Sequence, residues 1–460
     1  FSYVFGEKRD EWIKSFGKKP KAEAKREAYF FFTWILPLAA AVLNGNFWLI
    51  FPVFVLLRAL ANSLFPVFCR VEKRILPVLA EMPENERTLI TISAMLKGNA
   101  AELAEKLQLR YLANKHEGIA AALLLDFAGK EDKKEAEKLF SIIAEMNAAE
   151  NGHPYYAFIR KKLPAKDGSS CAWERKRGAI LELCALTLGK ETKSEFLYSA
   201  LPEGVKRLIL LDEDTEPMPG SLEKLIRCAA HPLNRPVVEN GKLICGRVLI
   251  SPLIGTHLLS ANRSFFTKMF GRNAGVDRYS QQRSELLFDL FGKTDFCGKG
   301  IVDIEAFYAL FWGKFPEERI LSHDHIEGLI GNAGYFSGTA MFEGLPKTLI
   351  SFEKRGHRWL RGDIQQLPFL PVFPFAEKLR LISCMLGGFE KPAAMVLLLA
   401  VLSREIHPIV FIILAFGKSL LPLIAALKNR ETEEARLIFS EAVFSFAVLP
   451  YTAMMATQVG

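Results

Sequence analysis

Two aspartates, Asp212 and Asp214, come directly after the apolar run Leu-Ile-Leu-Leu at residues 208–211. A continuous apolar run predicts a short strand covered on both faces of a parallel sheet, and such sheets bind ligands just beyond the carboxyl ends of their strands. Two carboxylates placed there could share a hard divalent cation, with water and substrate phosphates as its other ligands. The pattern therefore predicts a metal–diphosphate site at Asp212 and Asp214. A solvated acidic turn explains the same short pattern.

A third acidic candidate is Asp324, in the stretch Leu-Ser-His-Asp-His-Ile-Glu-Gly at residues 321–328. An apolar step leads into it, and a helix is predicted over residues 325–333. A carboxylate at the end of a strand, in the same α/β unit as a metal site, is a candidate general base. The alternative is an N-cap role for the helix, and the two roles are compatible.

A basic cluster, Arg175, Lys176 and Arg177, opens a predicted helix. A diphosphate would be favoured there because the helix dipole and the side-chain charges act together. A solvated basic face of a helix is the alternative explanation.

A second basic cluster combines Arg355, Arg358 and Trp359 within the stretch Arg-Gly-His-Arg-Trp-Leu-Arg-Gly-Asp. The arginines could clamp a diphosphate leaving group, and the indole could stack on a sugar. A segment lying on a membrane surface would have a similar composition.

Asp126 ends a second buried strand, where its carboxylate could accept a hydrogen bond from a nucleobase or a ribose. A helix N-cap or turn role is the alternative. Further along, Gly298, Lys299 and Gly300 form a glycine-rich stretch without the spacing of a phosphate-binding loop. These glycines favour close approach of the backbone to a ligand.

These candidates lie in a region where apolar runs and helical periodicity alternate, which predicts an α/β fold with a Rossmann-like, mostly parallel sheet and right-handed crossovers. The predicted strands are 88–96, 120–127, 155–160, 208–212 and 246–251, and the predicted helices include 100–109, 133–149 and 222–230. Residues 261–295 are predicted to form a loop-rich insertion.

Apolar segments at both ends of the chain predict transmembrane helices around this domain. Residues 28–43 and 47–68 read as a hairpin with basic residues at both outer ends, which places those ends in the cytoplasm. A buried helical hairpin is the alternative, and Arg58 inside the second run would have to face protein or an aqueous cavity. At the other end, residues 376–386 are predicted to lie on the bilayer surface, and two or three spans follow, including 408–427 and 437–457. The predicted division is 1–84, 85–375 and 376–460.

The composition fits a membrane-associated enzyme of a reducing compartment. The chain has 460 residues, a net charge of +8, a hydrophobic fraction of 50% and seven cysteines that form no Cys-x-x-Cys pair and have no histidine at metal-ligand spacing. The positive charge could meet anionic lipid or a phosphorylated substrate; no nucleic-acid motif accompanies it, so no nucleic-acid partner is expected. The missing initiator Met predicts a piece of a longer protein.

Taken in order, these motifs resemble membrane-integrated, inverting glycosyltransferases of the GT-A type, which include cellulose- and hyaluronan-synthase-like enzymes. The sequence departs from those enzymes by Ser-His-Asp at 322–324 and by Arg355 where a glutamine is usual. The amino-acid sequences of the motifs resemble those of the cyclic β-1,2-glucan synthases more closely. The stretches that carry this resemblance are YLAN at 111–114, LLDFA at 124–128, WERKRG at 173–178, LDEDT at 211–215, HPLNRP at 231–236, GKGI at 298–301, LSHDHIEG at 321–328 and HRWLRGD at 357–363.

The resemblance implies a hexosyltransferase that moves glucose from UDP-glucose onto a β-glucan acceptor at the cytoplasmic face of a bacterial inner membrane. It implies uracil near Asp126, Mg²⁺ or Mn²⁺ at Asp212 and Asp214, an acceptor loop at 298–300, Asp324 as the base, and Arg355, Arg358 and Trp359 at the departing UDP. Members of the family continue into a phosphorylase-like region that this chain lacks, which leaves ring closure and length control open.

Three alternatives remain at this point. The product could be another β-glucan of the cellulose type, or the chain could be a non-catalytic membrane scaffold or transporter with a degenerate transferase domain. The membrane helices could form an export channel, or they could only anchor the domain. The residues themselves do not decide the linkage, which comes from the resemblance alone.

Overall fold

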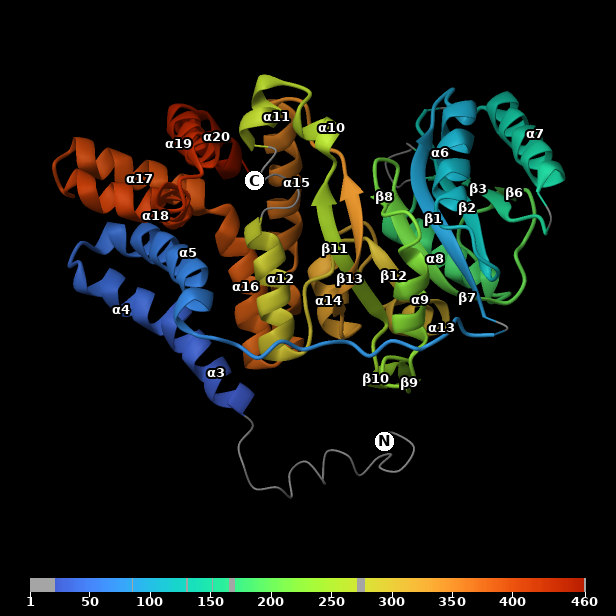
Figure 1. Ribbon diagram of the computed structural model, residues 1–460, viewed down its shortest axis with the longest axis horizontal. Coiled ribbons are helices and arrows are strands. Elements are labelled where there is room, and N and C mark those ends of the chain that lie inside the picture. The colour runs from blue at the N-terminus through green and yellow to red at the C-terminus, as the bar shows by residue number, and fades with distance from the viewer. Residues whose placement is uncertain are drawn as a thin grey trace, which may run out of the picture.

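The computed structural model describes residues 21–84, 86–129, 131–150, 152–164, 170–270 and 278–458. The first part of the predicted basic N-terminal segment lies outside the described residues, as does most of the predicted loop at 164–170. Figure 1 shows two regions: a central sheet with its covering helices, and a group of apolar helices contributed by both ends of the chain.

Nine of the described strands form one sheet in the order β6-β3-β2-β1-β7-β12-β11-β13-β8. The longest pairings are parallel: β1 with β2 and β7, β2 with β3, and β11 with β13. The strands are β1 (Arg87–Leu96), β2 (Ile119–Phe127), β3 (Tyr155–Arg160), β6 (Phe196–Tyr198), β7 (Val205–Asp212), β8 (Glu216–Pro217), β11 (Leu249–Thr256), β12 (Gly300–Asp303) and β13 (Gly334–Glu343). The predicted α/β class with a mostly parallel sheet is confirmed.

The apolar run that precedes Asp212 is buried from both sides, as its composition predicts. Leu208 and Leu210 pack into one hydrophobic cluster, and Ile209 and Leu211 into another on the opposite face. Alternate residues of a strand point to opposite faces of the sheet, so a strand covered twice must be apolar at every position.

Helices on both faces of the sheet provide these clusters. One face packs against α6 (Ala100–Leu112), α7 (Lys133–Ala149) and α9 (Leu222–Ala230), and the other against α8 (Arg175–Thr187) and α13 (Ile304–Phe311). Helix α7 has its predicted bounds because the carboxylate of Asp132 caps it, accepting a hydrogen bond from the backbone N–H of Glu135. Two short antiparallel hairpins, β4 (Leu163–Pro164) with β5 (Ser170–Cys171) and β9 (Val237–Glu239) with β10 (Lys242–Cys245), lie outside the main sheet.

The prediction of a loop-rich insertion over 261–295 is wrong, because much of its described part is helical. The helices are α10 (Leu258–Ala261), α11 (Phe265–Phe270) and α12 (Arg278–Phe291). Aromatic residues predicted to lie in a loop form a contact face on helix α11. Phe266 and Phe270 lie one turn apart on it and stack, with their ring centroids 4.9 Å apart. Both rings also contact Phe352, which ties this segment to the main domain.

Three described helical segments are long and apolar enough to cross a membrane: Ala24–Leu43, Phe47–Phe68 and Pro408–Lys428. The first comprises α3 (Lys21–Phe30), the π-helical turn η2 (Phe31–Ile35) and α4 (Leu36–Leu43); the second comprises η3 (Phe47–Leu49) and α5 (Ile50–Phe68); the third is α18. Only 22%, 44% and 22% of their apolar windows are buried inside the protein. Such large exposed apolar surfaces disfavour the buried hairpin of a water-soluble protein and indicate a membrane protein.

The remaining C-terminal helices form two bent pairs. Helices α16 (Phe375–Gly388) and α17 (Glu390–Leu402) meet at a bend of 56°, and α19 (Thr432–Ala447) and α20 (Leu449–Thr457) at 61°. The prediction of one continuous span over 437–457 is therefore wrong, because the structure has two helices with a bend between them. The break falls beside Pro450, which lacks a backbone N–H for continuing the helix. Counting each pair as one span raises the number of candidate spans in the described residues from three to five.

Two charged residues within the apolar runs, Arg58 and Lys418, contact other parts of the protein. Arg58 is 3% exposed, bonds to Ser383 of α16 and lies over the ring of Trp34 at 4.9 Å. Lys418 forms a 2.6 Å ion pair with Glu390 at the start of α17. Charges inside apolar helices are tolerated when they have partners within the helix group. The Arg58–Ser383 contact and a shared hydrophobic cluster join the N-terminal and C-terminal helices into one group (Figure 1).

Candidate functional site

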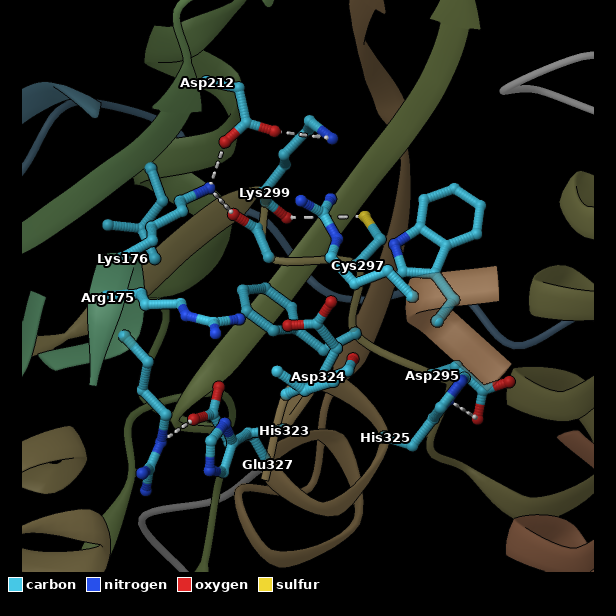
Figure 2. Close-up of a pocket in the computed structure, with 18 of the residues that line it drawn as sticks. Arg175, Lys176, Asp212, Asp295, Cys297, Lys299, His323, Asp324, His325 and Glu327 are labelled. Carbon is cyan, nitrogen blue, oxygen red and sulfur yellow. Dashed lines mark hydrogen bonds and ion pairs between the residues drawn. The ribbon is translucent and has the colours of Figure 1, made fainter. Parts of the chain in front are cut away.

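A cavity of about 1050 Å³ lies at the carboxyl ends of β7 and β13 and against the starts of α8 and α14 (Asp324–Ile330). Strand ends and helix starts converge on it, as expected for a ligand site of an α/β sheet. The predicted site residues that line it are Arg175, Lys176, Arg177, Asp212, Asp214, Gly298, Lys299, Asp324, Arg355, Arg358 and Trp359. Five stretches that are far apart in the chain therefore meet around one space, part of which Figure 2 shows.

Asp212 is held between two lysines. Its Oδ1 lies 2.5 Å from the Nζ of Lys176, and its Oδ2 lies 3.0 Å from the Nζ of Lys299. Burial alone would raise the pKa of Asp212, but the two ammonium groups hold it below its ordinary value. Asp212 is thus a carboxylate at neutral pH, with cations on both oxygens (Figure 2).

Lys299 also contacts Glu343, the last residue of β13, with its Nζ 2.7 Å from Oε2. The lysine side chain is 6% exposed, and its two carboxylate partners raise its pKa even though burial opposes this. Asp214 lies close to the same group, because a Cβ on Gly344 would be 3.1 Å from its Oδ2. Burial, followed by the charges of Asp212 and Glu343, raises the pKa of Asp214. Three carboxylates therefore gather at these strand ends.

Asp324 begins α14 and faces the glycine-rich stretch. A Cβ on Gly298 would lie 3.4 Å from its Oδ1 and 3.7 Å from the Nζ of Lys176, and the φ of +70° at Gly298 favours glycine there. Burial raises the pKa of Asp324, while Lys176, His325 and Lys299 oppose that rise. Lys176 also donates a 2.8 Å hydrogen bond to the carbonyl oxygen of Gly298. The glycine thus allows the backbone to approach the carboxylate closely.

The start of α8 is anchored beneath this group. Arg177 donates from Nε to Oε1 of Glu327 at 2.5 Å and lies over the ring of Phe315 at 4.4 Å. Burial raises the pKa of Glu327 to about 7, against the opposing charge of Arg177. Burial, followed by Arg177, lowers the pKa of His323 to about 3, so this imidazole is neutral at pH 7. In Figure 2, Asp324 lies between this pair and the group around Asp212.

The second basic cluster lies on α15 (Leu349–Gln365), which the side chain of Thr348 caps at its N-terminus. The guanidinium of Arg355 lies over the ring of Trp359 at 4.6 Å and reaches Oε2 of Glu343 at 3.4 Å. Trp359 is 43% exposed, which leaves much of its ring available at the cavity wall. The cluster is therefore part of the site and not a separate surface segment.

Two of the predicted site residues that the structure describes, Asp126 and Gly300, do not line the cavity. Asp126 is the penultimate residue of β2, is 8% exposed, and accepts from Arg160 at both oxygens, at 2.8 and 2.9 Å. Gly300 begins β12 inside the sheet, where a Cβ would lie 2.3 Å from the carbonyl oxygen of Ile250. The nucleobase role of Asp126 and the acceptor role of Gly300 stay predictions.

The most important residue that the sequence analysis missed is Glu343. It ends β13, so the signal used for Asp126 and Asp212, an acid at the end of a strand, applies to it. The strand itself, Gly-Tyr-Phe-Ser-Gly-Thr-Ala-Met-Phe-Glu, hides that signal because its glycines and hydroxyl residues interrupt the apolar run.

Two groups of side chains in the described residues could hold a metal ion. Asp212, Asp214 and Glu343 supply only carboxylate oxygens, the ligands that Mg²⁺ prefers. Asp295, His325 and Cys384 place one ligand atom each within 4.8 Å of one another. The sequence analysis found no histidine near a cysteine at metal-ligand spacing, because His325 and Cys384 meet only in the folded chain.

These features define a membrane-associated α/β protein with a charged ligand cavity at its strand ends. No protein-family model matches the chain. Over 329 residues, 68% of its length, the chain is 30% identical to the cyclic beta-(1,2)-glucan synthase NdvB of Rhizobium meliloti (strain 1021). The chain is therefore homologous to a segment of this glucan synthase, which confirms the resemblance predicted from the motifs. It spans 12% of the relative's length.

Among solved structures, the chain is similar to the mannosyltransferase PcManGT from Pyrobaculum calidifontis, described in complex with GDP-Man and Mn²⁺. The match covers 92% of this chain and 98% of that chain, with 13% sequence identity and a TM-score of 0.44.

Proposed function

We propose that this chain is an inverting glycosyltransferase domain of the GT-A type that moves glucose from UDP-glucose onto a growing β-1,2-glucan. Homology to a segment of a cyclic β-1,2-glucan synthase supports the reaction class. The observation that carries the proposal is the convergence of residues 175–177, 212–214, 298–299, 324 and 355–359 on one cavity. The residues alone predicted an anion site at 175–177, a cation site at 212–214, a base at 324 and a diphosphate clamp at 355–359, and the resemblance implied an acceptor loop at 298–300.

The donor's diphosphate would bind among the cations of the cavity. Arg175 and Lys176 come from the start of α8, where backbone N–H groups add to the side-chain charge, and Arg355 and Arg358 come from α15. Asp126 remains the proposed contact of the uracil. Although both of its oxygens accept from Arg160, a carboxylate oxygen has a second lone pair for another donor.

Asp212 and Asp214 are the proposed ligands of Mg²⁺ or Mn²⁺, with Glu343 as a neighbouring carboxylate. The donor set fits such an ion, because it offers oxygen ligands only and because burial, followed by the charges of Asp212 and Glu343, raises the pKa of Asp214, which a nearby cation would oppose. A divalent ion bound there would neutralise charge on the diphosphate. Lys176 and Lys299 perform part of the same charge compensation from the protein side.

Asp324 is the proposed general base. It would take the proton from the O2 hydroxyl of the acceptor sugar while that oxygen attacks C1 of the glucose, on the face opposite the bond to the diphosphate. The bond from C1 to the diphosphate oxygen breaks, UDP leaves, and an α-linked donor gives a β-linked product. Arg355 and Arg358 would stabilise the charge of the departing UDP, while Trp359 offers its exposed face to a sugar ring.

The test compares Asp324→Asn with the unchanged chain in membranes supplied with UDP-glucose and Mg²⁺ or Mn²⁺. We expect UDP release to fall to near background, whereas UDP binding persists because the amide keeps the shape of the carboxyl group. Asp132→Asn is a matched control, since asparagine caps a helix as well as aspartate and Asp132 lies at the start of α7. Unchanged turnover in Asp324→Asn would refute the assignment of the base.

The product of the same assay separates the alternatives. Linkage analysis that finds β-1,2 bonds supports the proposal, whereas β-1,4 bonds would identify a cellulose-like synthase. A chain that binds UDP but releases none from UDP-glucose under any divalent ion would be a non-catalytic scaffold or transporter. The proposed location is the cytoplasmic face of a bacterial inner membrane, with the glucan exported through or beside the helices.

A further inference from the structure

A second cluster of metal-binding side chains lies beside the proposed base and takes no part in the proposed reaction. Asp295 comes from the loop between α12 and β12, His325 is the second residue of α14, and Cys384 lies in α16. Their ligand atoms all lie within 4.8 Å of one another. Three separate elements thus present an oxygen, a nitrogen and a sulfur to one point.

The distances between these atoms suit a tetrahedral ion. The Nδ1 of His325 lies 3.7 Å from the Sγ of Cys384 and 3.8 Å from the Oδ1 of Asp295. Zinc bonds of about 2.3 Å to sulfur and about 2.0–2.1 Å to nitrogen or oxygen, set at tetrahedral angles, place neighbouring ligand atoms roughly 3.3–3.6 Å apart. Small side-chain movements would therefore close the group around an ion.

The surroundings of the cluster also suit a metal. The Oδ1 of Asp363 lies 3.6 Å from the Nε2 of His325, on the side of the ring away from Cys384. A histidine that binds a metal through one ring nitrogen commonly gives its other N–H to a carboxylate, which fixes the ring. On the other side, Arg380 lies 3.1 Å from Asp295 and holds that carboxylate in place. Figure 2 shows Asp295 and His325 facing each other to one side of Asp324.

We propose that Asp295, His325 and Cys384 bind one transition-metal ion of the zinc class, with Asp363 orienting the histidine. A thiolate and an imidazole select such an ion, whereas sites made only of oxygen ligands suit Mg²⁺. The proposed ion is therefore distinct from the one at Asp212 and Asp214. The protein supplies three ligands, and a fourth position is left for water.

The position of the ion indicates what it does. It would join the membrane-side helix α16 to α14, whose first residue is Asp324, and to the loop that leads into β12. A bound ion would thereby hold the start of α14 in place relative to the membrane helices. Its binding can be measured whether or not the chain transfers sugar.

The experiment measures zinc directly in the full chain, purified in detergent without chelators, and follows Co²⁺ binding by the absorption band of cobalt–thiolate charge transfer. We expect about one equivalent of zinc and a clear charge-transfer band. Cys384→Ser should abolish the band, His325→Gln should lose zinc, and Asp363→Asn should weaken binding about tenfold or more. Cys245→Ser, an exposed cysteine far along the chain, should leave both signals unchanged.

Each signal is read on the monodisperse fraction with a wild-type circular dichroism spectrum, so that a folding defect is not mistaken for lost binding. Wild-type protein without zinc and without a cobalt band after reconstitution would overturn the proposal and leave an ion-pair network. A cobalt band that persists in Cys384→Ser would also overturn it, because the thiolate would then belong to another site.

Discussion

Replacing Lys299 by methionine tests whether the charge network around Asp212 stabilises the fold. The lysine ammonium lies 3.0 Å from Asp212 and 2.7 Å from Glu343, and its side chain is 6% exposed. Methionine keeps most of the volume and removes only the charge. Breaking a buried ion pair by removing one partner costs about 3–5 kcal/mol, because the remaining charge is left buried.

The contacts that survive reduce this cost. Asp212, whose side chain is 35% exposed, keeps Lys176 at 2.5 Å, and Glu343 keeps Arg355 at 3.4 Å. We therefore expect Lys299→Met to lower the free energy of unfolding by about 2–3 kcal/mol. For a domain of about 290 residues, whose unfolding entropy is roughly 0.6 kcal/mol/K, that loss corresponds to a fall in Tm of about 3–5 °C.

The assay is thermal unfolding of the full chain in detergent, with Lys176→Met as the matched control. Lys176 is 31% exposed, and partly exposed pairs contribute about 0–1 kcal/mol, so the Tm of Lys176→Met should fall by less than about 2 °C. The pKa of Asp212 is lowered in the fold, so its ion pairs stabilise the protein above the ordinary aspartate pKa and cease to do so as the pH falls. The difference in Tm between wild type and Lys299→Met should therefore shrink in acid. Equal losses in both variants, or none in Lys299→Met, would refute this account.

Three further predictions concern the base, the sheet and the membrane. We expect kcat/KM to fall as the pH drops through the raised pKa of Asp324, because a base must be ionised, and Lys176→Gln should move this fall to higher pH; a fixed profile would contradict the assignment. Gly300→Ala should lower Tm well beyond Gly98→Ala. Both positions have positive φ, but only at Gly300 would a Cβ meet backbone, 2.3 Å from the carbonyl oxygen of Ile250, and such overpacking adds about 1–3 kcal/mol. In alkaline carbonate extraction the full chain should stay with the membranes, and release into the soluble fraction would contradict the role of the three apolar segments.

The parts of the fold that could be predicted are those in which local sequence and final environment agree. Strands β1, β2, β3 and β7 lie where continuous apolar runs predicted them, because both faces of each are covered. Strand β13 could not be found this way. Its pairing with β11 shifts register between Pro252 and Leu253, and residues 337–338 at this irregularity are exposed, so polar and small residues are tolerated inside the strand.

The same dependence on local sequence explains which residues of the site could be predicted. Asp212 and Asp324 were predicted because an apolar run or step leads into each of them, and their position at the edge of the sheet follows from that. Glu343 required knowledge of β13, and Cys384 required knowledge of how a membrane-side helix packs against α14. Asp126 has the expected place at a strand end, yet its bidentate pairing with Arg160 depends on β3 lying next to β2, which no local pattern reveals.

The predicted domain boundary at residue 375 rests on a change of composition and stays a prediction. Several ion pairs and hydrogen bonds connect the residues on its two sides. Lys391 of α17 binds both oxygens of Glu353 on α15, at 2.6 and 2.8 Å. Arg380 and Cys384 of α16 reach Asp295 and His325 at the cavity. Helix α15 carries the arginines and the tryptophan of the cavity wall, and α14 begins with the proposed base. Because side chains from beyond residue 375 contact both helices, the C-terminal helices help to set the geometry of the cavity.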